Sequence, residues 1–199
     1  MIDTFSSLLE VGALKPDNYA SCSPWITTTP IDLRSRHPSI IEQDFLAMDV
    51  NEHAEKWDLV SLSLVVNFVP EPKDRGNAFL MACLAALNIG RTHARTGTRI
   101  PAPVWPALSR CGFVGAHTAV GSLGLQLPLP CVENSRYMSS AHLASLMAAV
   151  GFVEVEWREG RKMAYWLYRK TGPGLGGDEF RMKRVCRVGR RNNFCILLA

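Results

Sequence analysis

The chain has 199 residues, 47% of them hydrophobic, and a formal net charge of +4. This length and apolar content fit one folded globular domain and exclude a disordered chain. No apolar stretch of about twenty residues and no basic-then-apolar leader is present, so we expect neither a membrane span nor a secretory signal.

The spacing of the cysteines and histidines bears on whether the chain has a metal site or disulfide bonds. The six cysteines form no C-x-x-C pair, and none of the five histidines lies within four residues of a cysteine or another histidine. We therefore expect no metal site and no disulfide framework. Free thiols indicate an intracellular, reducing compartment.

The first two predicted strands outline a nucleotide site. Leu8 to Val11 ends at Gly12 and a polar loop, which is the order that a nucleotide-binding first crossover needs. The next strand, Thr29 to Leu33, carries Asp32, twenty residues after Gly12. An acidic side chain near that separation accepts hydrogen bonds from both hydroxyls of an adenosine ribose. Gly12 and Asp32 are therefore candidate cofactor-binding residues.

A third short unit, Ile40 to Phe45, ends in Asp44 and Phe45. The Asp44 carboxylate can accept a hydrogen bond from an adenine amino group while Phe45 packs against the ring. The alternative is that Asp44 caps a helix before Leu46 to Val50 and Phe45 belongs to the core.

The most hydrophobic predicted strand lies in WDLVSLSLVVNFVP, residues 57–70. Between Leu59 and Val66, apolar residues stand at both odd-numbered and even-numbered positions, so a strand here would carry them on both faces. This pattern predicts a parallel strand that is buried on both faces. The apolar run ends abruptly at Asn67 and Phe68. Ligands of such sheets bind beyond the carboxyl ends of the strands, so we expect a site near Ser63 to Pro70.

After this strand, spacings of three and four residues predict a helix near Asn77 to Leu87. Its predicted core side chains are Phe79, Leu80, Cys83, Leu84 and Leu87. Residues 88–124 show neither helical nor strand periodicity and form an atypical insert for a compact domain.

A fifth strand is predicted over Leu123 to Leu129, with Asn134 to Tyr137 as its polar rim. A helix over Ser139 to Val150 follows, with Ser139 or Ser140 as its cap and Gly151 as its stop.

Three further strands are predicted in the tail: Phe152 to Trp157, Met163 to Tyr168 and Asn193 to Leu198. The last two are joined by a long, glycine-rich and basic connection. It contains a formal G-x-G-x-x-G match, which we interpret as a flexible loop because it opens no predicted helix. The basic charge of this region permits a phosphate-bearing partner and fits a solvated surface equally well.

Several blocks together carry a resemblance to a known family. They are LLEVGAL, PIDLRS, QDF, WDLVSLSLVVNFVP with the following Arg75 and Gly76, LPLPCVENSRY, KMAYWL and RRNNFCILL. These blocks span most of the chain and resemble the fungal nucleolar 25S rRNA adenine-N1 methyltransferases. LPLPCVENSRY and SLSLVVNFVP are the most specific of them.

The resemblance implies an α/β fold with a seven-stranded Rossmann-like methyltransferase sheet, mostly parallel with an antiparallel C-terminal hairpin, and helices on both faces. Residues 1–199 would form a single S-adenosylmethionine-dependent domain that methylates N1 of an adenine in large-subunit (25S) rRNA. The implied partner is this rRNA or a pre-ribosome, in the nucleus and nucleolus. We expect a monomer that uses no metal and contacts no membrane.

The resemblance also suggests roles for individual residues. Gly12 would let the backbone approach the methionine portion of the cofactor, and Asp32 would hold the ribose hydroxyls. Further cofactor candidates are Glu10, Asp44 and Phe45. Candidates that face the target base are Ser63, Asn67 and Phe68, with Asn67 at the base edge and Phe68 stacked on it. The alternative is that Asn67 and Phe68 are structural. Candidates that grip the RNA are Arg136, Tyr137, Lys183, Arg184, Arg190 and Arg191.

The sequence departs from the family pattern in two places. Only seven residues precede the first predicted strand, where relatives carry an additional helical segment, and the 88–124 insert replaces a short connection. We interpret the insert as a retained intron or a faulty gene model beginning near Gly97 and Thr98. Two alternatives to the enzyme follow. One is a noncatalytic S-adenosylmethionine sensor, which would need Gly12 and Asp32 but not LPLPCVENSRY or SLSLVVNFVP. The other is an inactive truncated fragment.

Overall fold

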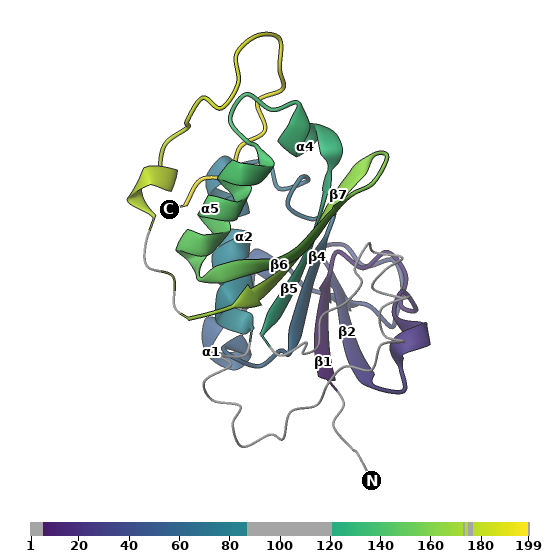
Figure 1. Cartoon of the computed structure of the whole chain (residues 1–199). Helices are drawn as coiled ribbons and strands as arrows, with labels where there is room; N and C mark the ends of the chain where they lie inside the picture. Colours follow the sequence, from purple (N-terminus) through teal and green to yellow (C-terminus); the bar gives the residue numbers. More distant parts are fainter. Residues whose placement is uncertain (1–5, 87–120, 173, 175–176, 199) are drawn as a thin grey trace.

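The computed structural model describes residues 6–86, 121–172, 174 and 177–198. Its seven strands form one sheet in the order β3-β2-β1-β4-β5-β7-β6 (Figure 1). The strands are β1 (Ser6–Val11), β2 (Ile26–Asp32), β3 (Ile41–Glu42), β4 (Leu59–Ser63), β5 (Ser122–Pro128), β6 (Phe152–Glu159) and β7 (Met163–Lys170). The first five run parallel, whereas β7 lies antiparallel between β5 and β6. This confirms the predicted seven-stranded, mostly parallel sheet.

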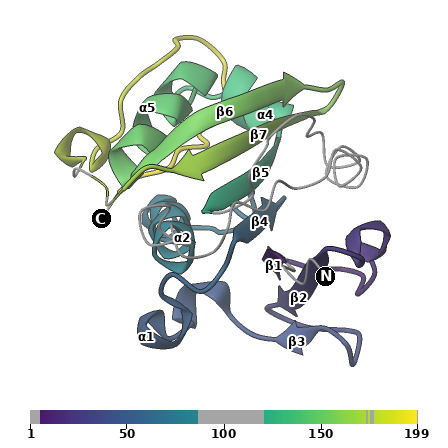
Figure 2. The same cartoon turned by 60° about the horizontal axis from the view of Figure 1, so that its bottom comes forward.

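The helices lie mainly on one face of the sheet. Figure 2 shows α1 (Val50–His53) and α2 (Pro72–Ala85) on that face, and α5 (Ser140–Val150) packs there beside α2. The opposite side of β1 and β2 carries the β1–β2 connection with the 3-10 turn η1 (Ala20–Cys22). The remaining short elements are η2 (Phe45–Ala47), α4 (Leu129–Glu133) and η5 (Asp178–Phe180).

Strand alternation divides the buried side chains between two cores. Leu9 and Val11 of β1 belong to the larger core, which α2 and α5 cover, whereas Leu8 belongs to the smaller one. The smaller core is closed by Tyr19 and Cys22 of the β1–β2 connection. Because both faces of the central strands are buried, their sequences read as nearly continuous apolar runs.

Local signals determine both ends of α5. The Ser139 hydroxyl accepts a hydrogen bond from the His142 amide at 3.1 Å, which satisfies one of the free donors of the first turn. The helix ends at Gly151, which has a φ of 101°. Glycine adopts this left-handed conformation without a Cβ clash. The predicted cap and the predicted stop are both confirmed.

The predicted fourth strand was too long. It ends at Ser63, because Leu64 adopts a φ of 59° and turns the backbone out of the sheet. Val66 is nevertheless fully buried, in a loop rather than in a strand. Beyond Ser63, the apolar run therefore predicted burial of Val66 correctly but predicted a strand where the structure has a loop.

The helix that follows was predicted too short. It begins at Pro72, in the position where proline is favoured because its missing amide donor has no intrahelical partner. Leu84 was expected in the core, but it is 46% exposed. Leu87 and most of the predicted 88–124 insert lie outside the described residues, and β5 already begins at Ser122.

The last predicted strand, Asn193 to Leu198, is wrong. The described residues of this segment lie in no strand, and the segment packs against α2 instead. The Leu197 amide donates a hydrogen bond to the Pro72 carbonyl at 2.9 Å, and Cys195 and Ile196 are buried. The C-terminal hairpin is therefore formed by β6 and β7. The Pro72 carbonyl at the start of α2 thus accepts the hydrogen bond from the Leu197 amide that a strand partner would otherwise have accepted.

No helix within the described ranges is long and apolar enough to cross a membrane.

Gly76 allows the C-terminal segment to approach α2. A Cβ at Gly76 would lie 2.0 Å from the Leu197 carbonyl oxygen, whereas one at Gly172 would meet nothing within 4 Å. We therefore expect Gly76→Ala to lower the free energy of unfolding by about 1–3 kcal/mol, even though alanine favours helix. Urea unfolding of Gly76→Ala beside Gly172→Ala measures this difference. Equal stabilities of the two variants would contradict the close approach.

Candidate functional site

The candidate site lies at the carboxyl end of β1, where the strand order reverses between β2 and β4. Gly12 follows β1, and its amide donates to the Ile31 carbonyl of β2 at 2.9 Å. Gly12 has a φ of 75°, and a Cβ there would lie 2.7 Å from Cγ2 of Val65. Conformation and space both require glycine here. In open α/β sheets this reversal is where ligands bind.

Glu10 lies two residues before Gly12 and is only 5% exposed. Its Oε1 accepts a hydrogen bond from Nδ2 of Asn18 at 2.6 Å, while its Oε2 is buried without a partner among the described residues. Burial raises the pKa of the Glu10 carboxyl, and the Asn18 hydrogen bond opposes that shift. A buried carboxylate oxygen without a donor suits a ligand that brings a hydrogen-bond donor or a positive charge.

Asp32 ends β2 at the same edge of the sheet, because Val11 and Ile31 are paired in the parallel register. One carboxylate oxygen, Oδ1, accepts a hydrogen bond from the Arg34 amide at 2.8 Å. The side chain is partly exposed, so solvent or a ligand reaches it. The structure therefore places Glu10, Gly12 and Asp32 near neighbouring strand ends, and their contact with a cofactor stays a prediction.

Asp44 and Phe45 lie beyond β3. Asp44 caps η2, with Oδ1 accepting a hydrogen bond from the Leu46 amide at 2.9 Å, and Phe45 is buried in the larger core. This is the capping alternative drawn from the sequence. A cofactor contact of either residue stays a prediction, and Asp44 is exposed enough to make one.

The end of β4 and the loop after it carry the three base-facing candidates. The Ser63 hydroxyl donates a hydrogen bond to Oε1 of Gln126 on β5. Oδ1 of Asn67 is buried without a partner in the described part of the chain, and Phe68 is 78% exposed. An accessible aromatic ring can hold a planar base by stacking.

The sequence pattern gave Arg75 no role, but the structure places it at the end of the base-facing loop. Its guanidinium donates to the carbonyls of Val69 at 2.7 Å, Pro70 at 3.0 Å and Cys195 at 2.8 Å. It also lies 4.7 Å from the centroid of the Phe194 ring. Arg75 thus ties the end of the base-facing loop to the C-terminal segment. Its partner Cys195 is 120 residues away, so no local pattern signals the contact.

Segment 181–192 carries most of the predicted RNA-binding residues, and it runs beside residues 132–138. Lys183 lies 5.5 Å and Arg136 6.0 Å from the centroid of the Tyr137 ring. Arg191 donates to Oδ1 of Asn134 at 3.0 Å. The structure thus gathers Arg136, Tyr137 and Lys183, with Arg184 and Arg190 exposed on the same segment.

Arg187 differs from its basic neighbours. Its Nη1 donates to the carbonyls of Val132 and Met138, each at 2.7 Å, and this holds the segment against the loop after α4. Among the residues that the structure describes, no group of three or more His, Cys, Asp or Glu side chains is placed to hold a metal ion.

Comparison with known proteins identifies the family. Residues 3–196 match the family model described as 25S rRNA (adenine(2142)-N(1))-methyltransferase, Bmt2. The chain belongs to this family. The Bmt2 match includes every strand of the sheet and the C-terminal segment up to Ile196.

Two curated Bmt2-like relatives are from yeasts. The 25S rRNA adenine-N(1) methyltransferase of Schizosaccharomyces pombe is 33% identical over 197 residues, covering 96% of this chain and 61% of the relative. The 25S rRNA (adenine(2142)-N(1))-methyltransferase of Saccharomyces cerevisiae is 29% identical over 164 residues, covering 81% of this chain and 39% of the relative. The chain thus spans less than two thirds of either relative.

Solved structures support the fold. An S-adenosylmethionine-dependent methyltransferase from Archaeoglobus fulgidus has a TM-score of 0.53 and 9% identity, covering 83% of this chain and 86% of its own. The N-methyltransferase NodS from Bradyrhizobium japonicum, in complex with S-adenosyl-L-homocysteine, has a TM-score of 0.50 and 14% identity, covering 85% of this chain and 80% of the NodS chain. At these identities the likeness shows the methyltransferase fold alone.

The raised pKa of Glu10 gives a prediction about stability and pH. A folded-state pKa above the unfolded value means that stability falls as the pH rises from the ordinary carboxyl pKa through the raised value. We expect Glu10→Gln to be more stable than the wild type at pH 7 and close to it at about pH 4. Urea unfolding at both pH values measures this. The control is Glu159→Gln, an exposed carboxyl on β6, and parallel pH dependence of wild type and Glu10→Gln would refute the prediction.

Proposed function

We propose that this chain is an S-adenosylmethionine-dependent methyltransferase that methylates N1 of an adenine in large-subunit (25S) rRNA. The observation that carries the proposal is the shared edge of β1, β2 and β4. This edge brings together a buried carboxylate oxygen with no partner among the described residues, a glycine in a left-handed turn and an acidic strand end, and the loop after β4 carries an exposed aromatic ring. Membership of the Bmt2 family supports the substrate class.

The residues at this edge fit the cofactor. Among the described residues, Oε2 of Glu10 has no hydrogen-bond donor, and the cofactor's ammonium group would provide one. Gly12 gives the backbone the left-handed turn that ends β1, and Asp32 retains an accessible carboxylate for the ribose hydroxyls. When bound, S-adenosylmethionine supplies an electrophilic methyl group.

The chain's own contribution to the reaction is positioning. Adenine N1 keeps its lone pair at neutral pH, so methyl transfer to it needs no strong base. Phe68 would stack on the extruded base, and Oδ1 of Asn67 would accept a hydrogen bond from its amino group. Arg75 positions this loop by holding the carbonyls of Val69 and Pro70. Such orientation and exclusion of water can supply about 7–11 kcal/mol in the best models.

The proposed partner is the rRNA or a pre-ribosome, and the proposed place of action is the nucleolus within the nucleus. Family membership supports both, as does the basic surface around Tyr137. Charges of this kind attract RNA phosphates, so binding is expected to weaken with added salt. We further propose that the chain acts as a monomer.

Cofactor binding tests the first part of the proposal. Calorimetric titration with S-adenosylmethionine should show saturable binding by the wild type and none by Gly12→Arg, because even a Cβ at Gly12 clashes with Val65. Asp32→Ala, which loses charge-assisted hydrogen bonds, should bind about 10-fold to 100-fold more weakly. Glu159→Gln, at the far edge of the sheet, is the control. A folded wild type that does not bind would overturn the proposal and favour an inactive fragment.

Methyl transfer to an rRNA fragment tests the second part. Phe68→Ala should lower kcat/KM at least about tenfold with unchanged cofactor affinity, because stacking on an aromatic side chain contributes about 1–3 kcal/mol per base. Phe68→Tyr keeps the ring and should retain activity. Asn67→Ala should also lose activity, and Val153→Ala, exposed on β6, is the control. Full activity of Phe68→Ala and Asn67→Ala would show that both residues are structural. A wild type that binds the cofactor without methylating RNA would favour the sensor.

A further inference from the structure

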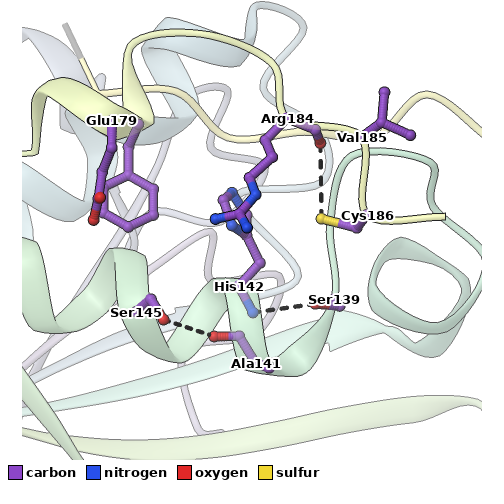
Figure 3. Close-up of a pocket in the computed structure, with 9 residues that line it drawn as sticks. Ser139, Ala141, His142, Ser145, Glu179, Arg184, Val185 and Cys186 are labelled. Atoms are coloured by element: carbon purple, nitrogen blue, oxygen red, sulfur yellow. Dashed lines mark hydrogen bonds between the residues drawn. The ribbon is translucent and has the colours of Figure 1, made fainter.

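A cavity of about 420 Å³ lies between the first turns of α5 and the C-terminal segment (Figure 3). This volume is in the range of pockets that hold small molecules. Residues of the α5 side are Ser139, Ala141, His142 and Ser145, and those of the C-terminal segment are Glu179, Phe180, Arg184, Val185 and Cys186. The site residues described above include only Arg184 from this set.

Arg184 gives the cavity a positive charge with no internal partner. Among the described residues, its guanidinium makes no hydrogen bond and no ion pair. Figure 3 shows the side chain extending from the C-terminal segment towards His142. Arginine binds phosphate oxygens through charge-assisted hydrogen bonds, so a phosphate group is the natural partner for this side chain.

The floor of the cavity is aromatic. The rings of His142 and Phe180 lie 5.3 Å apart between centroids, tilted by 53°. Burial lowers the pKa of His142, and Arg184 lowers it further while Glu179 opposes the shift. A neutral imidazole offers both a donor and an acceptor to a neighbouring ring. Planar, hydrogen-bonding groups such as nucleobases suit these surroundings.

Glu179 distinguishes between candidate ligands. Its carboxylate lines the same cavity as Arg184, so a simple anion such as inorganic phosphate would face repulsion as well as attraction. A nucleotide avoids this conflict because it presents a phosphate to Arg184 and a base amino group to Glu179. The cavity therefore favours a nucleotide over a bare anion.

The position of the cavity connects it to the candidate site. Ser139 lies two residues after Tyr137, whose ring is near Lys183 and Arg136. The loops from β5 to α5 leave the same edge of the sheet as the loop after β4, because β4 and β5 are parallel. The cavity and Phe68 therefore both lie in segments that follow the carboxyl ends of neighbouring strands.

We propose that this cavity binds one unpaired nucleotide of the RNA substrate, distinct from the methylated adenine. The proposal rests on the proposed function, since it deepens the choice of substrate. The cavity would act as an anchor that sets which stretch of RNA reaches the loop after β4.

The test uses fluorescence anisotropy of the full chain with a labelled single-stranded RNA of about twelve nucleotides. Three variants separate the cavity from general charge. Arg184→Ala removes the charge inside it, and Ser145→Trp fills it without a change in charge. Arg181→Ala removes one charge outside it, from an exposed residue that pairs with Asp178 at 2.9 Å.

We expect Arg184→Ala and Ser145→Trp each to raise the Kd for RNA at least about fivefold, and Arg181→Ala to raise it less than about threefold. Equal effects of the two arginine variants, with none from Ser145→Trp, would overturn the proposal and leave only non-specific charge attraction. Thermal unfolding verifies that Ser145→Trp folds, which is expected because Ser145 is exposed.

Methylation assays on the same proteins separate this proposal from the proposed function. Arg184→Ala and Ser145→Trp should raise the KM for RNA while kcat and cofactor affinity stay unchanged. If the wild type bound RNA with the expected pattern but transferred no methyl group, the cavity would stand and the activity would fail. If it methylated RNA and all variants bound alike, the activity would stand and the cavity proposal would fail.

Discussion

The candidate site depends on one backbone constraint, the left-handed turn at Leu64 that ends the central strand β4. This conformation costs a residue with a side chain about 1–3 kcal/mol, so the surroundings must hold it. The Leu64 amide donates to the Gln126 carbonyl at 3.1 Å, and Val65 then lies against Gly12. The turn releases Asn67 and Phe68 from the sheet at the edge where β1 and β2 also end.

The C-terminal segment, residues 193–198, contacts this arrangement at residues of α2. Gly76 lets it approach the backbone of α2, and the Arg75 guanidinium joins it to the loop after β4. Earlier in the chain, Arg187 holds segment 181–192 against the loop after α4. Residues distant in sequence thereby form one surface.

Much of the fold was predictable because the relevant signals are local. Both faces of β4 are buried, so Leu59, Val60 and Leu62 form an apolar run that predicts a strand. The Ser139 cap and the Gly151 stop likewise predict the two ends of α5. The prediction failed where one signal has two structural outcomes. Val66 is buried in a loop, and the apolar residues 195–198 cover a helix instead of joining the sheet.

The sequence by itself determined the strand that ends at Gly12, the acidic end of the second strand and the family to which the chain belongs, because each depends on neighbouring residues. Only the tertiary structure decided that Oε2 of Glu10 is buried without a donor from the described residues, that Arg75 binds a carbonyl 120 residues away, and that Arg184 and His142 line one cavity. These features depend on which side chains packing brings together. Contacts between distant segments leave no periodic trace in the sequence, whereas strands, caps and turns do.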